Sequence, residues 1–288
     1  MILPPRYNNW ILLILVSFLW GSPYILREIA LESFSHNQVA AFQVFFSFLL
    51  FIPLIIKNIR KLSKENILPL LLSGITGNIG PAYFFAKAQT QINSSVAGML
   101  NAMLPMVTLL IAILFFKAGT SKKVIGGILL AFAGTVVISF SGNSFGSSYF
   151  WGVFYVFMAI LSIAVSINIV SFSLPKLSGT EIASLAFLFV GPMAGCFLAI
   201  TDLSTPLASE SLPKSALMLC LLAVLTFVGV ILYNQLIKKS SHVFAASIAY
   251  IIPIIAIFLG IVIGGDSISI AQIASIFIIL VGVHLTHR

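Results

Sequence analysis

Apolar residues fill the chain in stretches of about 20, and short groups rich in charge, glycine, proline, asparagine and serine separate these stretches. A helix of that length crosses a hydrocarbon core of roughly 30 Å. The first stretch is too long for a secretory signal and lacks a small-residue cleavage site, so we interpret it as a span. The pattern predicts ten transmembrane helices, over residues 10–31, 37–56, 67–88, 93–116, 122–141, 150–173, 181–201, 214–237, 242–264 and 268–286.

The two halves of the chain resemble each other. A shift of 148 residues lays "SVAGMLNAMLPMVTLLIAILF" over "VFAASIAYIIPIIAIFLGIVI", and it pairs Pro105 with Pro253 and Gly134 with Gly282 without a gap. Each half then holds five helices, an odd number, so the second half enters the membrane from the opposite side. We therefore expect an all-α integral membrane protein in which two inverted five-helix repeats, residues 1–141 and 150–288, surround a central cavity, as in secondary transporters.

The composition supports a membrane protein, and the charges predict its orientation. The 288 residues are 60% hydrophobic and 8% charged, with a mean hydropathy of +1.14. The net charge of +8 does not indicate nucleic acid, because the basic residues lie in short connections beside the spans. With a cytoplasmic N-terminus, Arg27, Lys87 and Lys214 form the outer set, and the positive-inside rule then places both termini in the cytoplasm. The inner set is Arg6, Lys57, Arg60, Lys61, Lys64, Lys117, Lys122, Lys123, Lys176, Lys238, Lys239 and Arg288.

The third predicted span contains the unusual sequence "GNIGPAYFFAKAQTQ", residues 77–91. Two interpretations stay open: an interrupted helix that lines a cavity, and a packing kink in which Gly77 and Gly80 admit a close neighbour while Pro81 bends the helix. Asn78 lies deep in the span and should face protein or water, either as a substrate contact or in an interhelical hydrogen bond. Lys87 either reaches into the cavity or extends to the interface.

Polar and aromatic side chains in several spans predict a pocket for a small organic molecule. Aromatic residues also gather at membrane interfaces, but Trp20 and Tyr24 lie well inside their span. Asn101 has an alternative role beside the carbonyls that Pro105 leaves unpaired. The expected kinks are at Pro81, Pro105 and Pro253. The cavity candidates are Trp20, Tyr24, Gln43, Asn78, Tyr83, Lys87, Asn101, Asn168, Asn234, Gln235 and Tyr250.

The stretch "FLWGSPYILREIALESFSHNQVAAFQ" resembles the opening of EamA-like members of the drug/metabolite transporter superfamily. The resemblance continues through both halves, with the Trp20-Gly21 turn, the "SSVAGMLNAMLP" run and Gly134. It implies transport of amino acids or related metabolites, and it suggests export. Two positions depart from the family pattern. Gln43 replaces an arginine common in the second span, and Lys117 and Ala118 replace an acidic residue that only Asp266 keeps in the second half.

Several other function classes find little support. Cys196 and Cys220 lie in apolar stretches and indicate neither a disulfide framework nor a metal site. The few acids lie mostly in loops, and no nucleotide-binding loop or cofactor motif is present. The sequence therefore predicts a multi-pass transporter of a bacterial inner membrane, working by alternating access without a cofactor; a channel or facilitator is the alternative, and a polytopic enzyme is less favoured. Proton coupling stays open, with Glu28 as a loop-end acid. The histidines, expected to be solvated, are His36, His242, His284 and His287.

Overall fold

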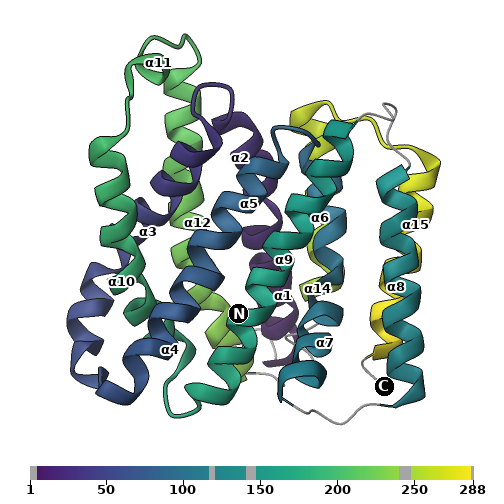
Figure 1. Ribbon diagram of the computed structural model, residues 1–288, viewed down its shortest axis with the longest axis horizontal. Helices are drawn as coiled ribbons and strands as arrows, with labels where there is room; N and C mark the ends of the chain where they lie inside the picture. The colour runs from purple at the N-terminus through teal and green to yellow at the C-terminus, as the bar shows by residue number, and fades with distance from the viewer. Residues whose placement is uncertain (1–4, 117–120, 141–146, 240–247, 287–288) are drawn as a thin grey trace.

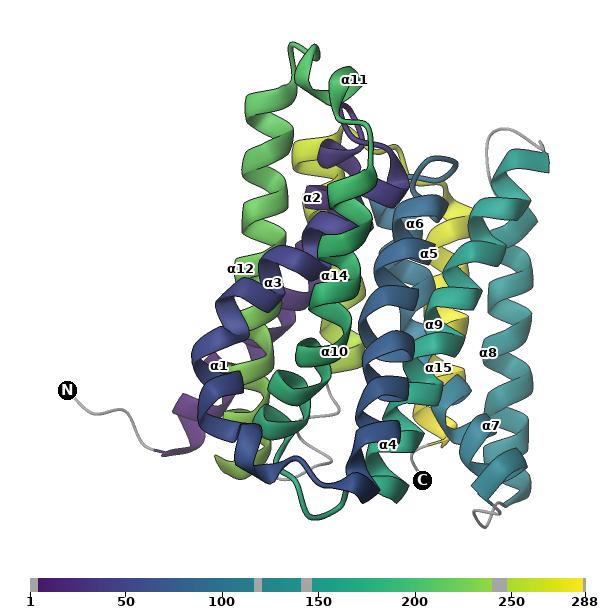
Figure 2. The ribbon, with the colours of Figure 1, turned by 60° about the vertical axis from the view of Figure 1, so that its left-hand side comes forward.

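The computed structural model of the chain describes residues 5–116, 121–140, 147–239 and 248–286. Within these ranges every regular element is a helix, which confirms the predicted all-α class. Most helices run between two ends of the molecule (Figures 1 and 2). The upper end in Figure 1 holds the connections 31–35, 89–93, 201–211 and 265–269, and the lower end holds 59–63 and 174–178.

The α-helices follow the predicted apolar segments closely. They are α1 (Pro5–Gly21), α2 (Pro23–Ala30), α3 (His36–Asn58), α4 (Lys64–Gly74), α5 (Gly80–Ala88), α6 (Ser94–Leu100), α7 (Leu104–Phe116), α8 (Lys122–Phe140), α9 (Ser147–Ser173), α10 (Gly179–Ile200), α11 (Ser204–Leu207), α12 (Leu212–Lys239), α14 (Ile248–Leu259) and α15 (Ile270–Thr286). Four shorter turns complete them: η1 (Ile59–Lys61), η2 (Ile75–Ile79), η3 (Asn101–Met103) and η4 (Gly260–Gly264).

Seven helical segments are long and apolar enough to cross a membrane, judged by length and composition over the described residues. They are Asn9–Ala30, His36–Lys61, Lys64–Ala88, Ser94–Phe115, Ser148–Ser173, Gly179–Ile200 and Leu212–Tyr233. Three further apolar helices are shorter, at Ile125–Gly134, Ile251–Gly264 and Ile270–Gly282. The chain is thus a multi-pass membrane protein, and the count of ten spans stays a prediction.

Capping boxes define where two of the long helices begin. Ser35 precedes α3, where its Oγ accepts from the Gln38 backbone N–H and the Gln38 side chain accepts from the Ser35 N–H at 2.8 Å. Ser178 and Glu181 form the same reciprocal pair at the start of α10. Each box satisfies backbone donors that a helix N-terminus otherwise leaves free.

The helices pack in pairs that are distant in sequence. α8 packs on α15 at one edge of the molecule, α3 on α10, and α5 on α9, while α12 contacts α1, α2 and α3. The largest buried cluster draws residues from most of the helices, α1, α2, α5, α6, α7, α9, α12, α14 and α15, and includes Tyr24, Met99 and Ile160. Large apolar side chains such as Phe115, Ile200 and Ile270 point outward, as expected for a surface that faces lipid rather than water.

The third predicted span is continuous but contains a π-helical turn, η2. Its wider pattern pairs the Gly80 N–H with the Ile75 carbonyl. In the same pattern the next donor would be Pro81, which has no N–H, so the Thr76 carbonyl would lack a donor. Ser162 of α9 supplies one, because its Oγ donates to the Thr76 carbonyl at 2.7 Å.

Close packing against α9 explains the two glycines of this segment. A Cβ at Gly77 would meet the Oγ of Ser166, and a Cβ at Gly80 would meet the Oγ of Ser162. The Ser166 Oγ donates to the Ser73 carbonyl at 3.0 Å. The glycines therefore bring α9 near enough for its serines to reach the backbone of this span.

Ser162→Ala should lower the free energy of unfolding by about 1–2 kcal/mol, because it removes the donor to the Thr76 carbonyl. Ser17→Ala is a matched control. The Ser17 Oγ donates to the Leu13 carbonyl at 2.8 Å, but that carbonyl keeps its own helical N–H donor. Reversible unfolding in mixed micelles measures both variants, and equal losses would contradict the special role of Ser162.

Candidate functional site

The first predicted span is broken into two helices near its middle. α1 ends at Gly21 and α2 begins at Pro23, whose missing N–H interrupts the helical hydrogen bonds. The Ser22 Oγ donates to the Phe18 carbonyl at 2.6 Å across this break. α2 then carries Arg27 into the interior of the bundle, where only 4% of the residue is exposed.

Neutral groups surround the buried guanidinium of Arg27. Its Nη1 donates to the Oε1 of Gln89 at 3.2 Å, and its Nη2 donates to the Oε1 of Gln43 at 3.3 Å. The guanidinium carbon lies 5.5 Å from the centre of the Phe85 ring, and the Nε is buried without a hydrogen-bond partner. The Gln89 amide is held in place because its Nε2 donates to the Tyr24 carbonyl at 2.7 Å. We call Arg27, Gln43, Gln89, Phe85 and Tyr24 the Arg27 cluster.

No carboxylate of the described residues forms an ion pair with Arg27. Among the described residues, the ion pair with N···O within 4.0 Å is Lys214 with Glu32. A buried charge is expensive unless it is paired, and ionisable groups inside a membrane protein commonly mark a pathway or a ligand site. The Arg27 cluster is therefore a site of positive potential enclosed by α2, α3 and α5.

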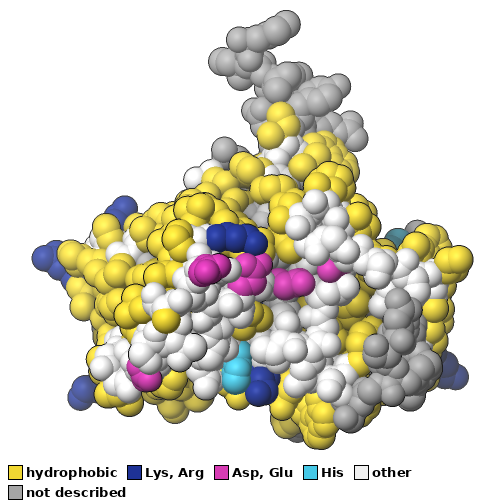
Figure 3. Space-filling view, turned by 90° about the horizontal axis from the view of Figure 1, so that it is seen from above, with side chains coloured by type: hydrophobic (Ala, Val, Ile, Leu, Met, Phe, Trp, Pro, Cys, Tyr) yellow, Lys and Arg dark blue, Asp and Glu magenta, His cyan; other side chains and the backbone are white. Residues whose placement is uncertain are grey.

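A second group of polar side chains flanks the cluster at the upper end. His36 begins α3, and its ring centre lies 5.6 Å from that of Tyr83 on α5. Lys87 is one helical turn beyond Tyr83 and is near enough to His36 for their charges to interact. All three side chains are half-buried. Figure 3 views this end and shows a histidine beside a basic side chain, below a row of Asp and Glu side chains.

Two acids of that end hold the N-terminus of α6. The Glu28 carboxylate accepts from the Ser94 backbone N–H at 2.6 Å. The Asp266 Oδ2 accepts from the Ser95 N–H at 3.1 Å and from the hydroxyls of Ser94 and Ser95 at 3.2 and 2.5 Å. Negative side chains at a helix N-terminus match both its free N–H groups and its dipole. These acids are thus committed to α6 rather than to Arg27.

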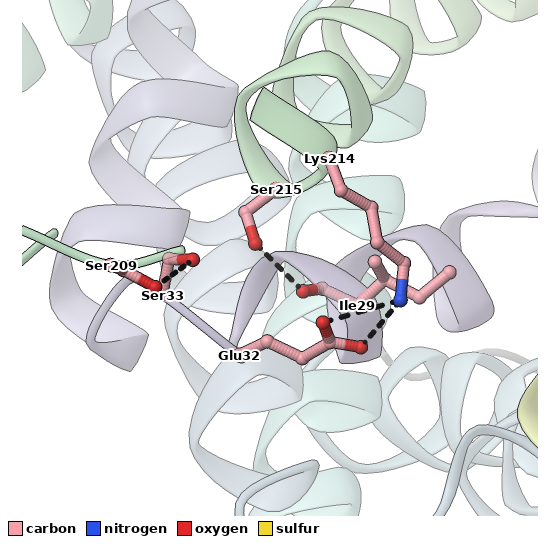
Figure 4. Close-up of polar contacts among 6 residues, drawn as sticks. All are labelled: Ile29, Glu32, Ser33, Ser209, Lys214 and Ser215. Atoms are coloured by element: carbon pink, nitrogen blue, oxygen red, sulfur yellow. Dashed lines mark hydrogen bonds and ion pairs between the residues drawn. The ribbon is translucent and has the colours of Figure 1, made fainter. Parts of the chain in front are cut away.

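Contacts of α2 and the connection after it with α12 and the connection before it close the upper end on its other side (Figure 4). The Lys214 Nζ lies 2.9 and 3.2 Å from the two Glu32 oxygens, and the buried Ser215 donates to the Ile29 carbonyl at 3.1 Å. The hydroxyls of Ser33 and Ser209 lie 2.9 Å apart. The Lys214 and Glu32 side chains are 55% and 41% exposed, so their pair contributes only about 0–1 kcal/mol.

The connection before α11 is ordered by its own hydrogen bonds. The Asp202 carboxylate accepts from the backbone N–H and the hydroxyl of Ser204 at 2.8 and 2.9 Å, and these bonds hold the pKa of Asp202 below its ordinary value. Their stabilising effect is present above the unfolded-state pKa of Asp202 and is lost as the pH falls through the lowered pKa. The Gln38 side chain donates to the Asp202 carbonyl at 2.8 Å, which ties this connection to α3.

The other predicted cavity residues are scattered rather than gathered at the Arg27 cluster. Trp20 packs on Tyr233 of α12, with ring centres 4.7 Å apart. Asn168 donates to the carbonyls of Thr108 and Ala164 at 3.0 and 2.9 Å, so its N–H donors serve helix packing. Asn101 is buried in η3, and Asn78 is half-buried in η2.

The remaining predictions lie along α5, α7, α12 and α14. Gln235 is exposed on α12, and the side chains of Asn234 and Tyr250 lie outside the described residues. Of the expected kinks, Pro81 follows the π-helical turn, Pro105 follows the 3₁₀ turn η3, and Pro253 is buried within α14.

Three residues of this region differ from the sequence-based expectation. Arg27, counted with the outer connection, is buried inside α2, and His36, expected in a loop, begins α3 against Tyr83. The third residue, Gln89, belongs to the Arg27 cluster but is not among the cavity residues that the sequence predicts. The spacing of Trp20, Tyr24 and Arg27 at i, i+4 and i+7 is the signal that could have linked Arg27 to the predicted pocket.

Comparison with known proteins identifies one family and several transporters among the relatives. The EamA-like transporter family matches residues 9–140 and again residues 150–288. "Uncharacterized inner membrane transporter YedA" of Escherichia coli (strain K12) is 26% identical over 266 residues, which cover 87% of this chain and 81% of that protein. "Uncharacterized transporter" of Archaeoglobus fulgidus is 22% identical over 98% of this chain and 99% of its own length. "Protein PagO" of Salmonella typhimurium is 23% identical over 96% and 91%.

A protein of known crystal structure shares the fold. It superposes with a TM-score of 0.62 over 97% of this chain and 96% of its own, at 15% sequence identity. A likeness at that identity concerns the arrangement of helices, not the ligand.

Proposed function

The chain belongs to the EamA-like transporter family, and from that membership we propose that it is a secondary transporter that exports a small organic metabolite by alternating access. The setting we propose is a bacterial inner membrane with both termini in the cytoplasm. The observation that supports transport is the buried, charged side chain of Arg27 in the interior of the helix bundle. Two relatives of the chain are also named as transporters. Catalysis has less support, because no group of three or more metal-ligating side chains gathers in the described part of the chain.

We propose further that the chain is two inverted five-helix repeats, residues 1–141 and 150–288, with ten spans around a central cavity. The double match to one family supports this division. The packing supports it as well, because α3 contacts α10 and α8 contacts α15, which are counterparts under the repeat. Likewise α5 on α9 has its counterpart in α12 on α2. Residues 141–146, which join the repeats, lie outside the described residues.

A topology experiment tests the inversion. Cys196 and Cys220 are free and exposed, so both are first replaced by serine. We expect Lys61→Cys to react with a membrane-impermeant maleimide from the cytoplasmic side only and Glu210→Cys from the opposite side only, since five predicted spans, an odd number, lie between the two positions. Reaction of both cysteines from the same side would overturn the inverted arrangement.

Transport itself is tested with purified protein in liposomes. A thermal-shift screen of metabolites finds a ligand, and counterflow of the labelled ligand then measures exchange. Saturable counterflow, absent from protein-free liposomes, supports a carrier, whereas a linear electrogenic leak supports a channel. A pH gradient that accelerates net flux would indicate proton coupling, for which Glu28 is the proposed acid. Asn78→Ala with unchanged transport and affinity would remove Asn78 from the proposed substrate site.

A further inference from the structure

We propose that Arg27 binds a carboxylate group of the transported metabolite, at the edge of its guanidinium that faces Gln43. This inference rests on the proposed function and adds a substrate class to it. A buried cation lies among neutral amides and an aromatic ring, and its Nε has no hydrogen-bond partner. A carboxylate bound there would neutralise the cation and accept a hydrogen bond from its Nε.

The hydrogen bonds of Arg27 leave N–H donors that an anion could use. A guanidinium has five N–H donors, and the two contacts to Gln89 and Gln43 are long, at 3.2 and 3.3 Å, with neutral acceptors. The Nε and Nη2 lie on the same edge of the guanidinium plane. The Nε has no partner, and the Nη2 makes only the 3.3 Å bond to Gln43. A carboxylate on that edge would accept two parallel, charge-assisted hydrogen bonds, which are stronger than the bonds now present.

A purely structural role does not account for this arrangement. An arginine near a membrane interface usually extends its guanidinium into water or pairs with an acid. Arg27 is 4% exposed and has no carboxylate within ion-pair distance among the described residues. Glu28 and Asp266, the acids on the neighbouring elements, are engaged with Ser94 and Ser95 instead. The free protein therefore keeps an unneutralised charge that a substrate anion would neutralise.

The surroundings indicate a small carboxylate with an apolar body. Phe85 and Tyr24 form an aromatic wall, with ring centres 5.4 Å apart. Gln43 is half-buried, so the edge of Arg27 beside it is the accessible one once helices α3 and α5 separate. Lys87, which interacts with His36 at this end of the bundle, would attract an anion toward the cluster. One guanidinium with amide neighbours suits a planar monoanion better than a phosphate dianion.

Ligand-induced thermal stabilisation of the full-length protein in detergent tests the proposal. The probes are acetate, butyrate and phenylacetate, each compared with its amide, together with phenyl phosphate. We expect phenylacetate to raise the unfolding midpoint saturably and phenylacetamide to have no effect. Arg27→Gln should weaken the apparent affinity for phenylacetate by about tenfold or more. Arg60→Gln removes a charge from the exposed η1 turn and should leave the affinity unchanged.

A second measurement uses the wild-type protein and therefore does not depend on correct folding of the Arg27→Gln variant. Phenylglyoxal modifies guanidinium groups, and mass spectrometry follows Arg27 and Arg60 separately. Phenylacetate should slow modification of Arg27 and not of Arg60. Equal stabilisation by acid and amide, no response to any of the three acids, preference for phenyl phosphate, or full affinity in a folded Arg27→Gln protein would each overturn the carboxylate site.

The outcomes separate this inference from the proposed function. Saturable counterflow of a neutral or cationic metabolite that Arg27→Gln does not affect would remove the carboxylate proposal and leave a transporter. Acid-specific, Arg27-dependent binding without any counterflow of the same acid would leave the binding site and contradict transport.

Discussion

Gly98→Ala is expected to lower the free energy of unfolding by about 1–3 kcal/mol, because the new methyl group would collide with the side chain of Ala256. Both residues are buried where α6 packs on α14, a contact between the two halves of the chain. The Ala256 side chain is a single methyl group and has no rotamer to which it can retreat. The helices themselves must move apart, which also disturbs the packing of Tyr24 near Gly98.

A compensating substitution makes this prediction specific. Ala256→Gly in the Gly98→Ala background removes the opposing methyl group and should restore much of the lost stability, so the two changes should be strongly non-additive. Gly126→Ala on α8 is the control, because a Cβ there meets nothing within 4 Å. Thermal and denaturant unfolding in micelles measures the wild type, the two single variants, the double variant and the Gly126→Ala control. Additive effects of the pair would show that the helices do not meet at these residues.

Asp266→Asn should cost about 2–3 kcal/mol, because the Asp266 carboxylate accepts from one backbone N–H and two hydroxyls at the start of α6. The amide removes the negative charge that the helix N-terminus favours, and it can place an N–H group against the Ser95 N–H. The connection that contains Asp266 lies between η4 and α15, so its bonds tie the second half of the chain to the first.

The control for this charge is Asp202→Asn. Asp202 is exposed and its carboxylate accepts from nearby Ser204, so its replacement should change stability much less than that of Asp266. Ser95→Ala combined with Asp266→Asn completes a double-mutant cycle, in which Ser95→Ala should cost less in the Asp266→Asn background than in the wild type. Equal losses for the two aspartates, or a fully additive cycle, would argue against the proposed link.

Much of the fold could be read from local sequence. Apolar stretches bounded by charge predict the helices, and Ser178 with Glu181 three residues later is a readable capping box. The resemblance to EamA-like transporters is confirmed by the family match over both halves. The irregular turns within the spans are harder to predict. The π-helical turn η2 is stabilised by the hydrogen bond from Ser162, which is remote in sequence from Pro81.

The candidate site was predicted only in part, for a physical reason. Tyr24 and Gln43 were expected to line a pocket, and both belong to the Arg27 cluster. The sequence analysis assigns Arg27 to the outer connections because of its charge. No local pattern shows whether a basic residue near the end of a span points inward. Asn168 is predicted to line the cavity, but its side-chain N–H groups donate to neighbouring backbone carbonyls instead.

The hydrogen bond from Ser162 to the Thr76 carbonyl limits how the protein can move. If α9 slid away from η2 and α5, the Thr76 carbonyl of η2 would lose its donor in a medium that offers no water, a loss of about 1–3 kcal/mol. We therefore expect α9 and α5 to travel together as one rigid block during a transport cycle. The sliding surfaces must then lie elsewhere, and crosslinks between these two helices should leave turnover intact.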